Sequence, residues 1–239
     1  MYSFSHAAEP VVVLELDVPS NVYVETYNGS QIMIKTVVAY APASPSPHIN
    51  YETTQVNNTL YIRMTLTTSI PCPNIEIYPI IICGTFITTH IYVPSNIMVL
   101  TINGSSSNVN MRISGLRTIK LGFTSSNVVM SLNAVDNAYL DMESTNVYAT
   151  IGNVDDVTLV LESTNARIGI LNPGNYAIDA GNSSMDISIP PSTCLWIRAS
   201  SSVITYPGGS IIGTGSGNLT QPTCRDYITL SVSSSTATI

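Results

Sequence analysis

Residues 143–170 read ESTNVYATIGNVDDVTLVLESTNARIGI and contain one four-residue motif twice. The motif begins at Glu143 and again at Glu162, which gives a spacing of 19 (162 − 143). A longer series of Ser-Asn or Thr-Asn pairs recurs at the same 19-residue spacing, with its asparagines at Asn108, Asn127, Asn146 and Asn165. Ser184 occupies the next position of this series. A fixed period of this kind predicts a repeat architecture.

Apolar residues keep the register of the repeat. They occupy the first, third and fifth positions after each asparagine, as in Val128, Met130 and Leu132, with mostly polar residues between them. A second alternating segment begins at the eleventh position after each asparagine, as at Ala138 and Leu140. Period-two alternation is typical of strands with one buried face. Two short strands and two turns in every 19-residue unit predict one rung of a β-solenoid, whose rungs must stack to bury their apolar faces.

The asparagine column predicts a ladder of amides at one turn of the solenoid. We also expect asparagine to adopt the left-handed backbone conformation that such a corner needs. The predicted fold class is therefore all-β, a single-chain β-solenoid with an N-terminal β region and a C-terminal strand. Its expected segments are 1–104, a β region continuous with the solenoid; 105–205, the repeat; and 206–239, a Gly-rich linker and strand. The alternative is a β-rich sandwich in which the repeat is coincidental.

A further similarity links the two halves of the chain. Residues 18–21 and 93–96 both read VPSN, and residues 28–30 and 103–105 both read NGS, with one common shift of 75 (93 − 18). Together with the Ser-Asn rungs, this pattern resembles the "putative adhesin" β-solenoid domains of bacterial and archaeal cell-surface proteins. The resemblance spans residues 11–212. It implies a secreted or cell-surface, non-enzymatic role, and it transfers no catalytic residue to this chain.

Composition excludes several classes of protein. The net charge is −7 and only 8 residues are Lys or Arg, which argues against binding to nucleic acid. The longest apolar run, residues 80–83, is far shorter than the roughly 20 residues of a membrane-spanning helix. Residues 1–6 lack the basic and apolar regions of a signal peptide, which leaves a cytosolic protein or the mature form of a secreted one.

Cysteines and sequons favour an extracellular setting. The four cysteines lack the spacing of a zinc or redox site, and their even number indicates two disulfides or, alternatively, free buried thiols: Cys72, Cys83, Cys194 and Cys224. Five Asn-x-Ser/Thr sequons, about as many as chance gives, are candidate glycosylation sites: Asn28, Asn57, Asn103, Asn182 and Asn218. We expect Asn28 and Asn103 to serve instead as Asn-Gly turns.

Carboxylates are the remaining candidates for chemistry. Asp136 and Asp155 occupy equivalent repeat positions, and Asp156 follows directly. Stacked carboxylates repel one another unless a proton or a cation such as calcium intervenes. The preferred interpretation is a solvated corner in which Arg117 compensates Asp136, with a weak calcium site and a polysaccharide-cleaving site as alternatives. The sequence lacks a nucleophile elbow and a phosphate-binding loop, so we expect no enzyme and no cofactor other than calcium.

The leading functional hypothesis is a structural subunit of an extracellular filament or matrix fibre, a homopolymer built from copies of this chain by head-to-tail contacts. Strand addition by a terminus would lock the copies, either by residues 8–17 or by a C-terminal strand whose apolar members are Tyr227, Ile228, Leu230 and Val232. The alternative is a monomeric surface adhesin that binds glycan. Outward-facing Tyr139 and Trp196 are expected to contact a cap, a partner or a ligand.

Overall fold

The computed structural model describes residues 1–40, 48–66, 85–181, 183–190, 194–206, 209–219, 227–233 and 236–238. All of the secondary structure in these ranges is β, and they contain no helix long and apolar enough to cross a membrane. The strands are β1 (Tyr2–Ala7), β2 (Val11–Asp17), β3 (Asn21–Tyr27), β4 (Gln31–Tyr40), β5 (Ile49–Val56), β6 (Thr59–Leu66), β7 (Thr85–Pro94), β8 (Val99–Ser105), β9 (Asn108–Ser114), β10 (Thr118–Thr124), β11 (Asn127–Glu143), β12 (Asn146–Glu162), β13 (Asn165–Ile170), β14 (Asn175–Gly181), β15 (Ser184–Ser188), β16 (Cys194–Tyr206), β17 (Gly209–Leu219), β18 (Tyr227–Ser233) and β19 (Thr236–Thr238).

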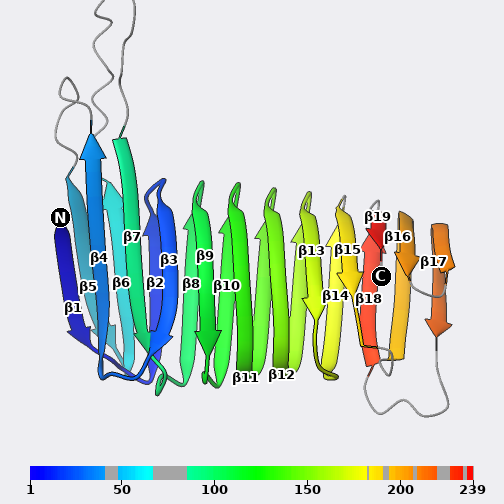
Figure 1. Ribbon diagram of the computed structural model, residues 1–239, viewed down its shortest axis with the longest axis horizontal. Helices are drawn as coiled ribbons and strands as arrows, with labels where there is room; N and C mark the ends of the chain where they lie inside the picture. Colours follow the sequence, from blue (N-terminus) through cyan, green and yellow to red (C-terminus); the bar gives the residue numbers. More distant parts are fainter. Residues whose placement is uncertain are drawn as a thin grey trace, which may run out of the picture.

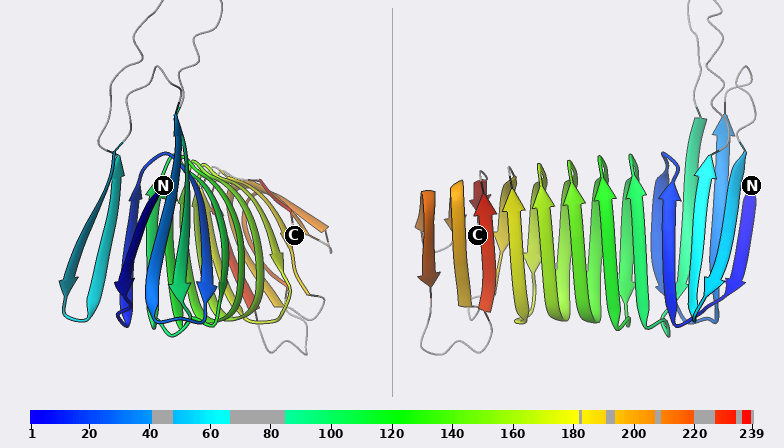
Figure 2. Two further views of the ribbon diagram at one scale, coloured as in Figure 1. Left: turned by 60° about the vertical axis from the view of Figure 1, so that its left-hand side comes forward. Right: turned by 180° about the vertical axis from the view of Figure 1, so that it is seen from behind.

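The strands stand side by side along the long axis in two facing layers (Figure 1 and Figure 2). We call the layer that contains β3, β9, β13 and β15 the ladder layer, and the layer that contains β2, β8, β10 and β14 the groove layer. The long strands β11 and β12 turn the corner, so their first halves lie in the ladder layer and their second halves in the groove layer. One strand from each layer makes a rung.

Neighbouring rungs pair in parallel at a 19-residue offset. Asn127 pairs with Asn108 on one side and Asn146 on the other, and the groove layer repeats the pattern where Ile119 pairs with Ala138. The 19-residue register predicted from the sequence is therefore confirmed. The core lies between the layers, and the predicted inward positions such as Val128, Met130 and Leu140 are buried.

The corner between the layers depends on a serine rather than on asparagine. Ser106, Ser125, Ser144 and Ser163 have φ between 49° and 53°, so the residue in the left-handed conformation lies two positions before each asparagine of the column. The prediction that these asparagines adopt it was wrong, because each begins a strand and is extended there. The residue between the left-handed serine and the asparagine is a buried serine or threonine, whose hydroxyl donates hydrogen bonds to backbone carbonyls at the corner. The hydroxyl of Thr164, for example, donates to Glu162 O and Met142 O, both at 2.9 Å.

The VPSN and NGS similarity does not mark equivalent places in the fold. Asn28 lies in a bend between β3 and β4, as expected of an Asn-Gly turn. Asn103, however, lies inside β8, so the second predicted turn was wrong. The physical reason is packing: a Cβ on Gly104 would lie 2.9 Å from the Phe123 ring, so this glycine makes room for an aromatic side chain in the core.

The N-terminal end of the stack departs from the parallel pattern. Strands β6 and β7 pair in parallel with β2 and β3, but β4 pairs antiparallel with β7, β1 with β4, and β5 with β6. Strands β1 and β5 thus form the two edges at this end. Phe4 and Tyr51, one from each edge strand, stack with ring centroids 5.5 Å apart and cover the end of the core.

At the other end, the order of strands in space differs from their order in the chain. The C-terminal rung, which consists of β18 and β19, lies between the rung β14–β15 and strand β16. Strand β17 pairs antiparallel with β16, with a register shift between Ala199 and Ser202. The first part of residues 206–239 was expected to be a Gly-rich linker, but the backbone of residues 209–219 is paired as a strand. The division into 1–104, 105–205 and 206–239 itself stays a prediction.

Candidate functional site

The asparagine column forms a hydrogen-bonded ladder on the surface. Nδ2 of Asn127 donates to Oδ1 of Asn108 at 2.9 Å, Asn146 donates to Asn127 at 2.8 Å, and Asn165 donates to Asn146 at 3.2 Å. The ladder has one further member, because Asn108 donates to Asn21 at 3.1 Å. The predicted amide ladder is thus confirmed. The repeat does not predict Asn21 as a member of the ladder, because its separation from Asn108 is 87, which is not a multiple of 19.

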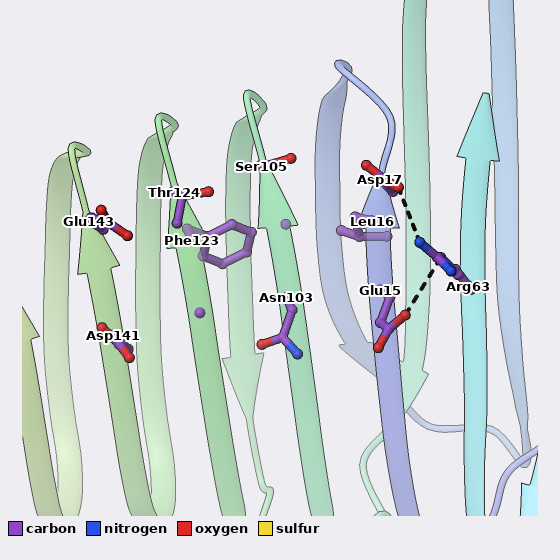
Figure 3. A pocket seen from close by; sticks show the side chains of 12 residues that line it. Glu15, Leu16, Asp17, Arg63, Asn103, Ser105, Phe123, Thr124, Asp141 and Glu143 are labelled. Carbon is purple, nitrogen blue, oxygen red and sulfur yellow. Dashed lines mark hydrogen bonds and ion pairs between the residues drawn. The ribbon is translucent and has the colours of Figure 1, made fainter. Parts of the chain in front are cut away.

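A shallow groove of about 420 Å³ crosses the groove layer near its upper corners (Figure 3). Its floor is low because Gly122 has no side chain on the row that also holds Glu15, Asn103 and Asp141. A second row, two residues further along the strands, contributes Ser105, Thr124 and Glu143. The strand pattern therefore lines the groove with polar groups above a floor of buried Leu16 and Phe123.

Charge in the groove is unbalanced. Arg63 on β6 lies 3.7 Å from Glu15 Oε2 and 3.4 Å from Asp17 Oδ2, whereas Asp141 and Glu143 stand on the other side (Figure 3). Four carboxylates and one guanidinium leave three excess negative charges. The ion pairs are half-exposed, so each stabilises the fold by at most about 1 kcal/mol. The groove can receive a cationic or hydrogen-bonding group, but no histidine or cysteine lines it.

The Arg63 contacts could not be anticipated from the repeat. Strand β6 pairs with β2 at an offset of 48 (59 − 11), and no motif in residues 59–66 resembles a Ser-Asn rung. The groove carboxylates on the repeat side have a weak signal, because Glu143 and Glu162 occupy equivalent positions and do pair in adjacent strands.

The predicted calcium candidates lie on the surface, at one corner of the stack. Asp136, Asp155 and Asp156 are exposed at the corner opposite the serine corner, where β11 and β12 cross from one layer to the other. Within the described ranges, no group of three His, Cys, Asp or Glu side chains is arranged to hold a metal ion. The backbone of Arg117 lies in this corner, since its carbonyl accepts a hydrogen bond from Asn137 N at 2.9 Å.

Exposed tyrosines lie on both layers. Tyr139 faces outward on the groove layer, as expected, with 42% of its surface exposed, and it pairs with Lys120 of the neighbouring strand. Tyr148, which is 55% exposed, lines a second hollow of about 350 Å³ beside the ion pair of Arg167 and Asp186, whose Nη2 and Oδ2 are 3.0 Å apart. These two rings are therefore accessible to a ligand.

A third aromatic group lies on the ladder layer near the N-terminal end. Tyr23 and His90 stack with centroids 4.9 Å apart and planes inclined by 12°, and His90 also stacks on Tyr92. Lys35 Nζ lies 5.5 Å from the centroid of Tyr92. Because His90 stacks on both tyrosines, one face of each of these rings is covered within the cluster, while Tyr23 remains 39% exposed.

The remaining predicted sites are untested. Cys72, Cys83 and Cys224 lie outside the described residues, and Cys194 begins β16, whose side chains are not described. Asn57 lies exposed in the β5–β6 turn, with φ of 48°, and Asn28 and Asn103 are also exposed. Asn182 lies outside the described residues, Asn218 belongs to β17, and Trp196 belongs to β16.

The C-terminal strand pairs with its own chain. Residues Tyr227, Ile228, Leu230 and Val232, the predicted assembly strand, belong to β18, which pairs with β14 on one side and β16 on the other. Neither edge of β18 is therefore free for another chain in this arrangement. The strands with one unpaired edge are β1 and β5 at one end and β17 at the other, among the strands described.

Comparisons with known proteins give structural matches alone. No protein-family model matches the sequence, and no curated protein matches it. A solved "putative cell adhesion protein" of Clostridium sporogenes is similar over 99% of this chain and 95% of its own, with 13% identity and a TM-score of 0.42. A "putative adhesin" of Bacteroides fragilis is similar over 100% and 96%, with 12% identity and a TM-score of 0.34. Both solved structures carry adhesin-type names, as does the resemblance indicated by the sequence, but similarities of this degree assign neither a family nor an activity to this chain.

Proposed function

We propose that this chain is a non-enzymatic β-solenoid subunit of an extracellular or cell-surface filament, which assembles end to end with copies of itself. One observation carries the proposal: among the described strands, each end of the stack has an edge strand without protecting residues, β17 at one end and β1 at the other, although β5, the second edge strand at the N-terminal end, carries Glu52. Strand β17 reads GSIIGTGSGNL, and β1 reads YSFSHA. Neither contains Lys, Arg, Asp, Glu or Pro, the residues that natural proteins place on edges to prevent pairing with another chain.

The two ends differ, which favours a polymer over a closed dimer. One end offers β1 and β5 on separate layers, and the other offers the single long strand β17. An interface between unlike surfaces is heterologous, and it propagates into a filament unless its rotation closes a ring. The low content of charged residues, 10%, weakens repulsion between stacked copies.

A specific observation favours the alternative, a monomeric surface adhesin that binds glycan. Strand β18 completes the stack of its own chain, which is what a self-contained domain needs. Tyr139 and Tyr148 are exposed on opposite layers and offer aromatic surface to a sugar. The similarity to adhesin-type structures is compatible with both proposals, because it concerns the fold alone.

Light scattering and negative-stain microscopy of the purified chain test the proposal. We expect filaments from the unmodified protein, and loss of filaments when Thr214→Lys and Ser216→Lys place two charges on β17. A matched control adds the same charge to the middle of the stack, by Ser131→Lys and Thr158→Lys at exposed positions, and should still polymerise.

Dispersed particles at every concentration would overturn the filament proposal. A glycan screen with Tyr139→Ala and Tyr148→Ala would then test the adhesin. Filaments that survive the β17 lysines would place the contact at another surface and contradict the edge-strand mechanism.

A further inference from the structure

The C-terminal rung occupies a place that the repeat assigns to another strand. On the groove layer, Tyr176 of β14 pairs with Ile228, and Ile228 pairs in turn with Leu195 of β16. On the ladder layer, Ser184 of β15 pairs with Thr236, which pairs with Val203 of β16. The C-terminal rung is therefore sandwiched between two parallel neighbours in both layers.

Strand β16 nevertheless keeps the register of the next repeat. Leu195 follows Tyr176 at a spacing of 19 (195 − 176), and Val203 follows Ser184 at the same spacing (203 − 184). Everywhere else between β8 and β15, strands related by the 19-residue offset pair directly, as Asn165 does with Ser184. Strand β16 thus lies in register with β14–β15 but one strand further away.

The connection into β16 has the length of a single step. From the first residue of β15 to the first residue of β16 there are ten positions (194 − 184), as there are from β13 to β14 (175 − 165). In the second case the chain passes to the adjacent rung, about 4.8 Å away. The same length of chain therefore suffices for β16 to stack directly on β14–β15, with every row of paired residues preserved.

We infer that the position between β14–β15 and β16 is an exchange slot, which the C-terminal rung can leave and the C-terminal rung of a second copy of this chain can fill. The incoming strands would make the backbone pairs that this chain's own β18 and β19 make, so exchange creates no new contact and loses none. Residues 220–226, the seven positions between β17 and β18, span up to roughly 24 Å when extended, which permits the rung to reach a neighbour.

This inference deepens the proposed function and rests on it, because it names the element that would lock copies together after their edges meet. It also reconciles two observations. The C-terminal strand has both edges paired in a single chain, and yet the repeat provides a direct successor, β16, for the rung next to it. A chain that gives away its rung can close the slot with β16 or accept the rung of another copy.

The test cuts the native protein rather than refolding a fragment. A protease site is inserted into residues 220–226, the folded chain is cleaved there, and a fluorescent peptide of residues 225–239 is added in excess. We expect the peptide to replace the cut rung at one per chain, measured by native mass spectrometry. A control peptide with Leu230→Pro lacks a backbone donor in the middle of β18 and should bind at least about 10-fold more weakly.

The outcomes separate this inference from the proposed function, because the cut protein need not polymerise to report exchange. Retention of the cut rung for days under a large excess of peptide would overturn the inference, and so would equal binding of the proline peptide.

If cleavage unfolds the chain, the uncut protein is used instead. Two differently tagged full-length populations are mixed, and exchange predicts mixed species. A crosslink between Ala177→Cys and Thr229→Cys should abolish these mixed species. Mixed species that persist in the crosslinked protein would also overturn the inference. If the protein forms filaments but its C-terminal rung does not exchange, the proposed function stands and the exchange slot is contradicted.

Discussion

The repeat region, residues 108–188, and the N-terminal end of the stack bury their cores in different ways. In the repeat region every strand is parallel to its neighbours, and one corner motif recurs. At the N-terminal end, antiparallel pairs, stacked aromatic rings and the ion pairs of Arg63 replace that regularity. The difference shows where the distinctive surface groups lie. The uniform rungs form a scaffold, and the charged groove and the aromatic cluster lie where the irregular strands join it.

The largest effect should come from the core of the repeat region. Leu159 is fully buried between rungs, so Leu159→Ala should lower the free energy of unfolding by about 3 kcal/mol. Phe4→Ala at the N-terminal edge should cost less than half as much, because Phe4 is only partly buried there. Chemical denaturation of both variants measures the difference. Equal losses would show that the edge is as tightly packed as the repeat.

A smaller effect is expected from the backbone of a corner. A Cβ on Gly174 would lie 2.6 Å from the carbonyl oxygen of Val154, which cannot move without disturbing β12. Gly174→Ala should therefore destabilise the chain by about 2 kcal/mol. Gly181→Ala is the matched control, since no atom lies within 4 Å of its added carbon. Similar thermal unfolding of the two variants would contradict this account.

The amide ladder distinguishes the interior of the repeat from its end. Asn146 donates one amide hydrogen bond and accepts another, so Asn146→Ala should cost about 1 kcal/mol. Asn165→Ala removes a single bond of the ladder and should cost about half of that. Denaturant titrations that rank the two variants in the opposite order would argue against a cooperative ladder.

The smallest effect concerns pH and belongs to the N-terminal end. Burial raises the pKa of Tyr51 above its ordinary value of 10.0, despite a hydrogen bond to Thr36 that lowers it, and Tyr2 adds a further increase. Because the folded-state pKa exceeds the unfolded value, this contribution to stability is complete below pH 10 and is lost as the pH rises through the folded pKa. Tyr51→Phe should flatten that alkaline decline in a series of thermal melts. If the alkaline decline in stability is unchanged in this variant, titratable groups other than Tyr51 cause it.

The sequence predicted the periodic part of the fold and missed what periodicity does not encode. Asn108 to Asn165 form the expected ladder, and the inward positions are buried, because a 19-residue offset brings like residues together. Pairings at other offsets carry no such signal: 87 (108 − 21) for Asn21, 48 (63 − 15) for Arg63 and 52 (228 − 176) for Ile228. The groove and the interposed C-terminal rung depend on those pairings, so they became visible only in three dimensions.

The amide ladder also gives the molecule a direction. In each of its bonds, from Asn21 to Asn165, the Nδ2 of the later residue donates to the Oδ1 of the earlier one. The amide dipoles therefore align along the stacking axis and polarise one another. Two molecules joined in the same orientation continue this alignment, whereas two joined in opposite orientations set the rows against each other at the junction. A fibre of this protein would accordingly be polar, with two electrically distinct tips from which growth could proceed at different rates.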